Sequence, residues 1–142
     1  MTSSGGETIL IVEDVDDVRT MLALVLKHHG YAVLEAGSGD AALRIADAHQ
    51  GPIHLMICDL NLPEMNGRQV AQRFLALRPS VRILFMSGHS SDEAVREGHI
   101  GRGQAFLAKP FTLDELASKV CDVLAMLDCD VMPGYYIRPP EE

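Results

Sequence analysis

Short runs of apolar, β-branched residues alternate along this chain with longer segments of helical periodicity. Each short run has the length and composition of a buried strand, and each longer segment repeats apolar residues every three or four positions. Five strands that alternate with about five helices, through short connections, favour a parallel sheet with right-handed crossovers and helices on both faces. We therefore predict an α/β fold with one doubly wound domain. Its predicted strands are Thr8–Val12, Ala32–Glu35, Ile53–Cys58, Arg82–Met86 and Gln104–Ala108.

The segments between these strands carry apolar stripes that should cover the sheet. We expect Asp14 or Asp16 to cap the first helix, Gly30 to end it, and Thr112 with Glu115 to form a capping box at the last helix. The predicted stripes are Val15, Val18, Leu22 and Leu26; Ala42, Leu43, Ile45 and Ala46; Val70, Phe74 and Leu77; and Leu116, Val120, Leu124 and Leu127.

Length and composition limit the chain to one ordinary domain. Its 142 residues are 47% hydrophobic, and they leave no room for a second folded unit. We expect a disordered stretch over residues 1–6, a folded domain over residues 7–128, and a proline-containing tail or linker over residues 129–142.

The charge of the chain argues against several classes of partner. A formal net charge of -8, spread along the sequence, disfavours binding to nucleic acid or to an anionic membrane. No apolar run approaches the roughly 20 residues of a membrane span, and the first residues lack the features of a signal peptide. We therefore expect a cytoplasmic protein.

The three cysteines, Cys58, Cys121 and Cys129, show no CxxC spacing. Neither a disulfide framework nor a zinc site is indicated. Cys58 and Cys121 are expected to be small buried hydrophobic residues.

Polar side chains follow four of the predicted strands, at the edge where open α/β sheets bind ligands. Glu13 and Asp14 end the first strand, Asp59 the third, Ser87 the fourth and Lys109 the fifth. Three carboxylates that converge there would repel one another, which would raise a pKa or recruit a cation. Mg²⁺ prefers carboxylates, backbone carbonyls, waters and phosphate oxygens, and it suits such a site.

This set of groups can support phosphoryl transfer. An ionised Asp59 beside a metal can attack phosphorus to give an aspartyl phosphate, while Lys109 and the Ser87 hydroxyl stabilise the phosphoryl oxygens. Taken singly, each residue is more often a turn, a helix cap or a solvated charge. The coincidence of four such groups at four strand ends favours the functional interpretation.

Four motifs carry a family resemblance. The chain over roughly Glu7 to Asp128 closely resembles the receiver domain of two-component response regulators, most of all the receivers of hybrid sensor histidine kinases or their stand-alone relatives. The motifs are ILIVED (Ile9 to Asp14), ICDLNLPEMNG (Ile57 to Gly67), ILFMSG (Ile83 to Gly88) and FLAKPF (Phe106 to Phe111).

The resemblance implies a flavodoxin-like sheet with strand order 2-1-3-4-5, and it implies a role for each matching residue. Asp59 becomes the phosphoacceptor. Mg²⁺ or Mn²⁺ would be held by Glu13, Asp14, Asp59 and the backbone carbonyl of Asn61. Ser87 and Lys109 would bind the phosphoryl group, Ser87 and Phe106 would act as the switch, and Asn61 and His89 would tune dephosphorylation. In this family a cis bond is common at the position of Lys109 and Pro110, and Gly67 should provide a positive φ or a close approach.

Partners and output follow from the same resemblance. The phosphoryl donor would be a sensor histidine kinase or a histidine phosphotransfer protein, docked on the first helix near Val15, Val18 and Met21. The signal would pass to an unknown downstream protein through the face made by the fourth helix, fifth strand and fifth helix, which could also form a homodimer. The chain would catalyse only its own phosphorylation and dephosphorylation.

Two other classes of function stay open. Phosphatases with an aspartyl-phosphate intermediate typically carry a DxD motif, in which the second Asp moves a proton; Asn61 occupies that position here and cannot do so. A pseudo-receiver would keep the fold as an interaction module without phosphorylation, although Asp14, Asp59 and Lys109 are all present.

Overall fold

Strands and helices alternate in the computed structural model, which describes residues 6–88 and 105–125. Along these two ranges no helix is both long enough and apolar enough to cross a bilayer. The fourth predicted helix falls outside the described residues. The elements are β1 (Thr8–Val12), α1 (Asp16–His28), β2 (Ala32–Ala36), α2 (Gly39–Ala48), β3 (Leu55–Asp59), α3 (Gly67–Leu77), β4 (Arg82–Ser87), β5 (Phe106–Ala108) and α5 (Leu113–Ala125).

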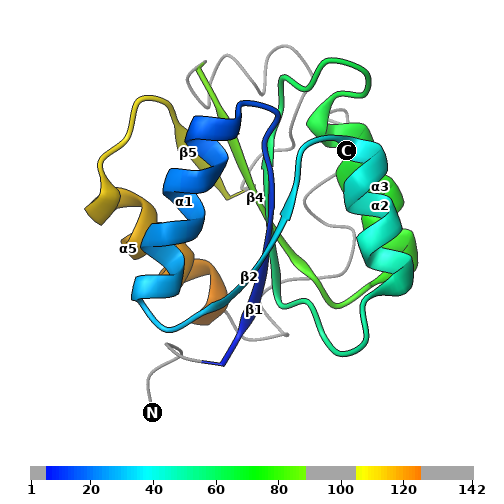
Figure 1. Cartoon of the computed structure of the whole chain (residues 1–142), viewed down its shortest axis with the longest axis horizontal. Helices are drawn as coiled ribbons and strands as arrows, with labels where there is room; N and C mark the ends of the chain where they lie inside the picture. The colour runs from blue at the N-terminus through cyan, green and yellow to red at the C-terminus, as the bar shows by residue number, and fades with distance from the viewer. Residues whose placement is uncertain (1–5, 89–104, 126–142) are drawn as a thin grey trace.

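The five strands form one sheet in the order β2-β1-β3-β4-β5, with every neighbouring pair parallel. Val12 lies opposite Cys58, and Cys58 lies opposite Phe85, so the carboxyl ends of β1, β3 and β4 meet at one edge. The predicted fold class and strand order are confirmed. Figure 1 shows α1 and α5 on one face of the sheet and α2 and α3 on the other.

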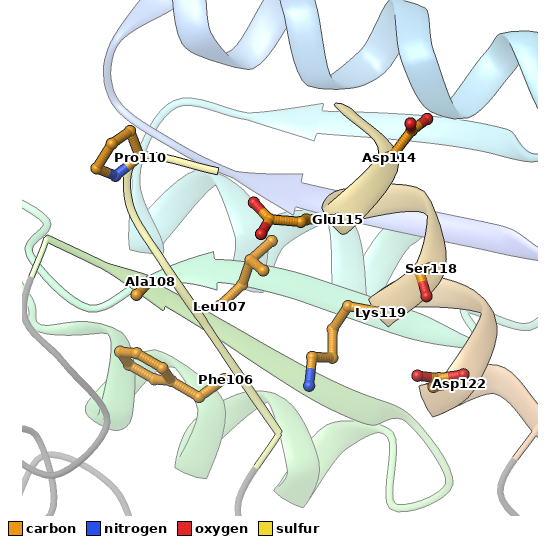
Figure 2. Close-up of a pocket in the computed structure, with 9 residues that line it drawn as sticks. All are labelled: Phe106, Leu107, Ala108, Pro110, Asp114, Glu115, Ser118, Lys119 and Asp122. Atoms are coloured by element: carbon orange, nitrogen blue, oxygen red, sulfur yellow. The ribbon is translucent and has the colours of Figure 1, made fainter. Parts of the chain in front are cut away.

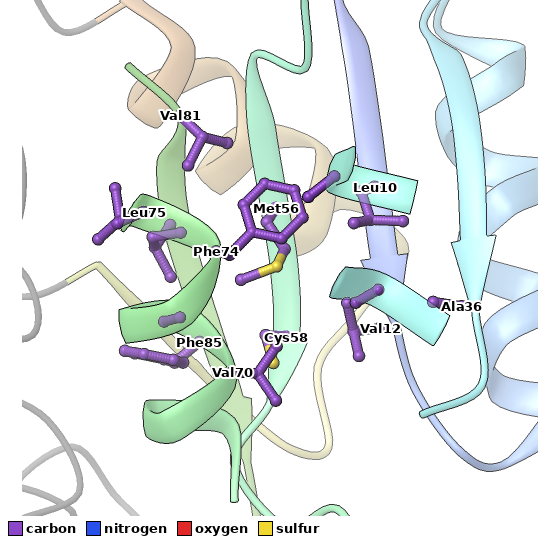
Figure 3. Close-up of a cluster of buried hydrophobic side chains, with 14 of the residues drawn as sticks. Leu10, Val12, Ala36, Met56, Cys58, Val70, Phe74, Leu75, Val81 and Phe85 are labelled. Carbon is purple, nitrogen blue, oxygen red and sulfur yellow. The ribbon is translucent and has the colours of Figure 1, made fainter. Parts of the chain in front are cut away.

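Two hydrophobic clusters fill the layers on the two faces. Side chains along a strand alternate between the faces, so Met56 and Cys58 join the cluster beneath α2 and α3, whereas Leu55 and Ile57 join the cluster beneath α1 and α5. Figure 3 shows the first cluster, with Phe74 of α3 packed over the sheet. Because β3 is buried on both faces, its residues read as a continuous apolar run up to Asp59.

The ends of the helices follow the predicted chemistry in two places. Gly30 has φ of 94°, which an L side chain rarely adopts, and it follows His29, the C-cap of α1. The Thr112 hydroxyl accepts a hydrogen bond from the Glu115 N–H at 3.0 Å, and the Glu115 carboxylate accepts one from the Thr112 N–H at 2.8 Å. The predicted capping box at α5 is therefore present.

The start of α1 differs from the prediction. Val15 occupies the N-cap position and makes no side-chain capping bond, so neither Asp14 nor Asp16 caps this helix. The buried carboxylate of Glu13 instead accepts the backbone N–H of Val15 at 3.1 Å. This bond fixes the backbone of Val15, the residue that precedes the first turn of α1.

Three residues predicted to be buried are exposed. Val15 is 49% exposed because it precedes the first helical turn, and Leu77 is 50% exposed because it is the last residue of α3. Cys121 follows buried Val120 by one position, which turns its side chain by about 100° away from the sheet. Cys58 is buried, as predicted.

The strands also shift slightly from their predicted bounds. β3 begins at Leu55, two residues later than predicted; the preceding His54 accepts the N–H of Thr8 on Nδ1 of its ring at 2.9 Å and donates its own N–H to the Thr8 carbonyl at 2.8 Å. β5 begins at Phe106, with Ala105 outside the strand, and Gln104 lies outside the described residues.

Candidate functional site

The polar residues predicted to act together do gather at the carboxyl edge of the sheet. Glu13 follows β1, Asp59 ends β3, Ser87 ends β4, and Lys109 follows β5. The first three are buried, with exposed fractions of 0%, 4% and 1%. Burial of three polar groups at one edge demands partners for each of them.

Three carboxylates form the centre of the site. Glu13, Asp14 and Asp59 each offer an oxygen, and these oxygens all lie within 4.8 Å of one another. Glu13 and Asp59 are buried, whereas Asp14 is exposed to solvent. Clustered carboxylate oxygens with one open side are the donor set that a hard divalent cation prefers, so the residues present fit a metal ion.

Lys109 lies between the two buried carboxylates. Its Nζ is 2.7 Å from Oδ2 of Asp59 and 3.0 Å from Oε1 of Glu13. Because an unpaired buried charge is costly, this ammonium group compensates both carboxylates at once. The Lys109 side chain is 29% exposed, so the solvent can still reach it.

The pKa values of these groups reflect their burial and pairing. Burial raises the pKa of Glu13, and the hydrogen bonds from Val15 and Lys109 only partly oppose this shift. Burial also acts to lower the pKa of Lys109, but its hydrogen bonds to Asp59 and Glu13 outweigh that effect, and its pKa is raised. Lys109 is therefore held firmly in its charged form.

Both oxygens of Asp59 have a hydrogen-bond donor. Oδ2 accepts from Lys109, and Oδ1 accepts the backbone N–H of Asn61 at 2.8 Å. The Asn61 side chain extends to the neighbouring strand, where its Nδ2 donates to Oγ of Ser87 at 3.3 Å. These bonds hold the Asp59 carboxylate in one orientation at the mouth of the site.

The loop after β3 depends on a glycine. A Cβ added to Gly67 would lie 2.5 Å from the carbonyl oxygen of Asp59 and 2.9 Å from Cα of Leu60. The predicted close approach is confirmed, and the predicted alternative of a positive φ is not observed. The bond between Lys109 and Pro110 is cis, as expected.

Phe106, predicted to be a switch residue, lies on β5 and packs half-buried against the cluster beneath α2 and α3. Phe106 also lines a hollow between β5 and α5 that has a volume of about 630 Å³. Figure 2 shows its ring on the side of β5 away from α5. Lys119 and Asp122 line the opposite, helical side of this hollow. His89, predicted to tune dephosphorylation, lies outside the described residues.

Arg19 also contacts the site, although the motifs did not point to it. Its Nη1 donates to the backbone carbonyl of Glu13 at 2.7 Å. One signal was present in the sequence: Arg19 lies near the N-terminus of α1, where the helix dipole disfavours a cation. A basic residue in that position needs an acidic or carbonyl partner.

Comparisons with known proteins agree with this geometry. The sequence model of the response regulator receiver domain matches residues 9–121. The chain is 35% identical to the sensor kinase CckA of Brucella abortus over 88% of its own length, but spans only 13% of that kinase. It is 30% identical to the response regulator receiver protein CpdR of the same organism, covering 79% of this chain and 92% of CpdR.

Solved structures give the same result. The receiver domain of the hybrid histidine kinase CckA superposes with a TM-score of 0.70 at 34% identity, covering 82% of this chain and 98% of that domain. The response regulator TrrA of Thermotoga maritima, solved with Mg²⁺ and BeF, gives a TM-score of 0.68 at 26% identity, covering 83% and 99%. With its sheet order, its acidic cluster and these matches, the chain belongs to the response regulator receiver domain family.

Proposed function

We propose that Asp59 is the phosphoacceptor, and that its phosphoryl group comes from a phosphohistidine on a sensor histidine kinase or a histidine phosphotransfer protein. The observation that carries this proposal is the position of Asp59, a buried carboxylate inside a three-acid cluster with Lys109 Nζ 2.7 Å away. A purely structural Asp would not need two further acids at the same edge of the sheet.

In the proposed reaction, an oxygen of Asp59 attacks the phosphorus atom and the P–N bond to the donor imidazole breaks. Asp59 gains a P–O bond and the imidazole leaves with the electron pair. Lys109 then pairs with a phosphoryl oxygen, and the Ser87 hydroxyl donates to another. Both groups are already at the edge of the sheet where the phosphoryl group would arrive. The chain would catalyse this reaction and the hydrolysis of its own acyl phosphate, and no other.

Glu13, Asp14 and Asp59, with the backbone carbonyl of Asn61, would hold Mg²⁺ or Mn²⁺. The ion supplies positive charge that offsets the phosphoryl oxygens as they approach three carboxylates. The oxygen donors in the cluster support this assignment, as does the Mg²⁺ named in the TrrA complex.

The first prediction tests the phosphoacceptor. Incubation of the protein with acetyl phosphate and Mg²⁺ should add the mass of one phosphoryl group, as measured by mass spectrometry of the intact chain. Asp59→Asn should show no gain, because an amide oxygen is too weak a nucleophile. Asp47→Asn, an exposed carboxylate on α2, is the matched control and should be phosphorylated normally.

Three outcomes would contradict the proposal. A mass gain that persists in Asp59→Asn would place the phosphoryl group elsewhere. No gain in the native chain, even from a competent kinase, would indicate a pseudo-receiver. Multiple turnover of a phosphomonoester would indicate a phosphatase.

The donor protein would dock on the outer face of α1. Met21 is 42% exposed and Leu24 is 63% exposed, and Val15 at the entry to the helix is 49% exposed. Val18, also predicted for this surface, is half-buried and packs against the core cluster beneath α1 and α5. The apolar docking surface therefore consists of Val15, Met21 and Leu24.

The second prediction tests this docking surface. Leu24→Asp should slow phosphotransfer from a phosphohistidine protein by about tenfold, since a charge in an apolar contact costs on the order of 1.4 kcal/mol or more. Phosphorylation by acetyl phosphate should be unchanged, because a small donor needs no docking surface. Leu77→Asp, a leucine of α3 that is 50% exposed, is the control and should transfer normally. Equal slowing in both variants would reject this surface.

The phosphorylated state would be read through the face of β5, α5 and the predicted fourth helix, either by a downstream protein or by a second copy of the chain. Phe106 borders the hollow on this face, and a shift of Ser87 toward the phosphoryl group would change the packing around it. Asn61 and His89 would tune the lifetime of the acyl phosphate. We propose that the chain meets its phosphohistidine donor in the cytoplasm.

A further inference from the structure

Glu13 is held at four points, two on its backbone and two on its side chain. Its N–H donates to the carbonyl of Ala36 at 3.1 Å, and its carboxylate accepts from Val15 and Lys109. The fourth contact is the bond from Nη1 of Arg19 to its carbonyl oxygen, at 2.7 Å. The proposed function assigns no role to this fourth contact.

The Arg19 guanidinium is itself tightly held. Its Nη2 lies 2.6 Å from Oδ1 of Asp16, and its Nε lies 3.5 Å from Oε1 of Glu35 on β2. A Cβ added to Gly37 would lie 3.3 Å from Nη1, so the loop after β2 also closes on this group. With its side chain only 18% exposed, Arg19 is a fixed donor.

The carbonyl of Glu13 belongs to the peptide unit that joins Glu13 to Asp14. Because this unit is planar, fixing the direction of the carbonyl also fixes the Cα of Asp14. Asp14 is the exposed member of the acidic cluster, at the solvent edge of the site. By fixing the peptide plane between Glu13 and Asp14, Arg19 therefore constrains the orientation of Asp14, a member of the acidic cluster.

We propose that Arg19 is a positioning residue for the acidic cluster: by holding the carbonyl of Glu13, it keeps Glu13 and Asp14 oriented to bind the divalent cation. The inference rests on the proposed function, because it concerns the same site. Arg19 does not touch the phosphoryl group. Its effect is on the affinity of the cluster for the ion.

A purely electrostatic effect of Arg19 and a positioning role predict opposite changes in Mg²⁺ affinity when Arg19 is replaced. A nearby positive charge that acted only through space would repel the cation, so its removal would tighten binding. A positioning role predicts weaker binding when the planar, forked guanidinium is lost, even if the positive charge is kept. Arg19→Met removes both the charge and the fork, whereas Arg19→Lys keeps the charge and loses the fork.

The experiment measures Mg²⁺ binding to the full chain by titration calorimetry, without phosphoryl donor. We expect Arg19→Met and Arg19→Lys each to weaken Mg²⁺ binding by about tenfold, as is typical when a group that orients a metal ligand is lost. Glu35→Gln, which removes the longer 3.5 Å ion pair and leaves the bond to Glu13, should bind like the native chain. Phosphorylation by acetyl phosphate should recover in both Arg19 variants at saturating Mg²⁺.

Two results would overturn the inference alone: native or tighter Mg²⁺ binding in Arg19→Met, or native binding in Arg19→Lys. Should Arg19→Met fail to fold, as shown by its thermal unfolding, Arg19→Lys alone decides. Absence of Mg²⁺ binding in the native chain is a different outcome, since it would remove the metal site and the proposed function with it.

Discussion

Lys109→Met is expected to lose both stability and phosphorylation. The substitution leaves the buried carboxylates of Glu13 and Asp59 facing each other without the ammonium group that now lies 3.0 and 2.7 Å from them. Removing one partner of a fully buried ion pair costs about 3–5 kcal/mol; with Lys109 29% exposed, we expect a loss of about 2–3 kcal/mol. Urea unfolding measures this loss directly.

The rate of phosphorylation by acetyl phosphate should fall by about 10²-fold in the same variant, because a fixed positive charge no longer meets the phosphoryl oxygens. Mg²⁺ binding should be retained or tightened, since a competing cation has been removed from the cluster. Lys27→Met, at an exposed lysine of α1, is the matched control and should be phosphorylated normally. A native rate in Lys109→Met would exclude the proposed role of Lys109.

The stability loss should depend on pH with a definite sign. Burial already raises the folded-state pKa of Glu13 above its ordinary value, and removal of Lys109 should raise it further. A carboxyl group with a raised folded-state pKa binds more protons in the native state, so its contribution to stability falls as the pH rises through that window. Lys109→Met should therefore be least stable at neutral to alkaline pH and should recover part of the loss at mildly acidic pH.

Gly67→Ala is the second substitution with a large expected effect. Its Cβ would lie 2.5 Å from the carbonyl oxygen of Asp59 and 3.0 Å from the carbonyl carbon of the same residue, and these backbone atoms have little freedom to move. Overpacking of this kind costs about 1–3 kcal/mol, which outweighs the gain of at most ~1 kcal/mol from placing Ala in a helix. Thermal unfolding should show a clearly lowered midpoint.

The same substitution should slow phosphorylation, since the displaced backbone is that of Asp59 itself. Gly88→Ala provides the control, because a Cβ at Gly88 meets no atom of residues 6–88 and 105–125 within 4 Å, and its stability should stay within about 0.5 kcal/mol of the native chain. Equal stability of Gly67→Ala and the native chain would contradict this prediction, because it would show that the loop after β3 can move enough to accommodate the added Cβ.

The fold could be predicted from the sequence because one pattern, a short apolar run followed by a helical segment, recurs along the chain. Five apolar runs separated by helical segments specify a parallel α/β sheet, and the resemblance supplied the strand order that alternation alone leaves open. Element ends were harder to predict. The carboxylate of Glu13, which accepts the N–H of Val15 two residues further along, replaces the expected cap of α1, and such a side-chain contact has no periodicity in the sequence.

The members of the site could be predicted, but not their contacts. Residue type and strand-end position placed Glu13, Asp59 and Lys109 together, because the carboxyl ends of parallel strands meet. Two sets of contacts could not be predicted: those of Lys109 with both carboxylates, and the bond from Arg19 to a backbone carbonyl. Both depend on side-chain conformation, which produces no periodic pattern in the sequence. The burial of Cys121 is predicted wrongly because residue type records hydrophobicity and not the direction in which a helix faces, and that of Leu77 because the apolar stripe does not show that Leu77 is the last residue of α3.

The sheet separates two hydrophobic clusters that share only strand backbone, one beneath α2 and α3 and one beneath α1 and α5. Substitutions in separate packing environments combine nearly additively. A substitution beneath α2 and α3 and one beneath α1 and α5 should therefore change the free energy of unfolding independently of each other. Variants that combine changes on the two sides, which Figure 1 shows separated by the sheet, can thus be designed by adding their separately measured effects on stability.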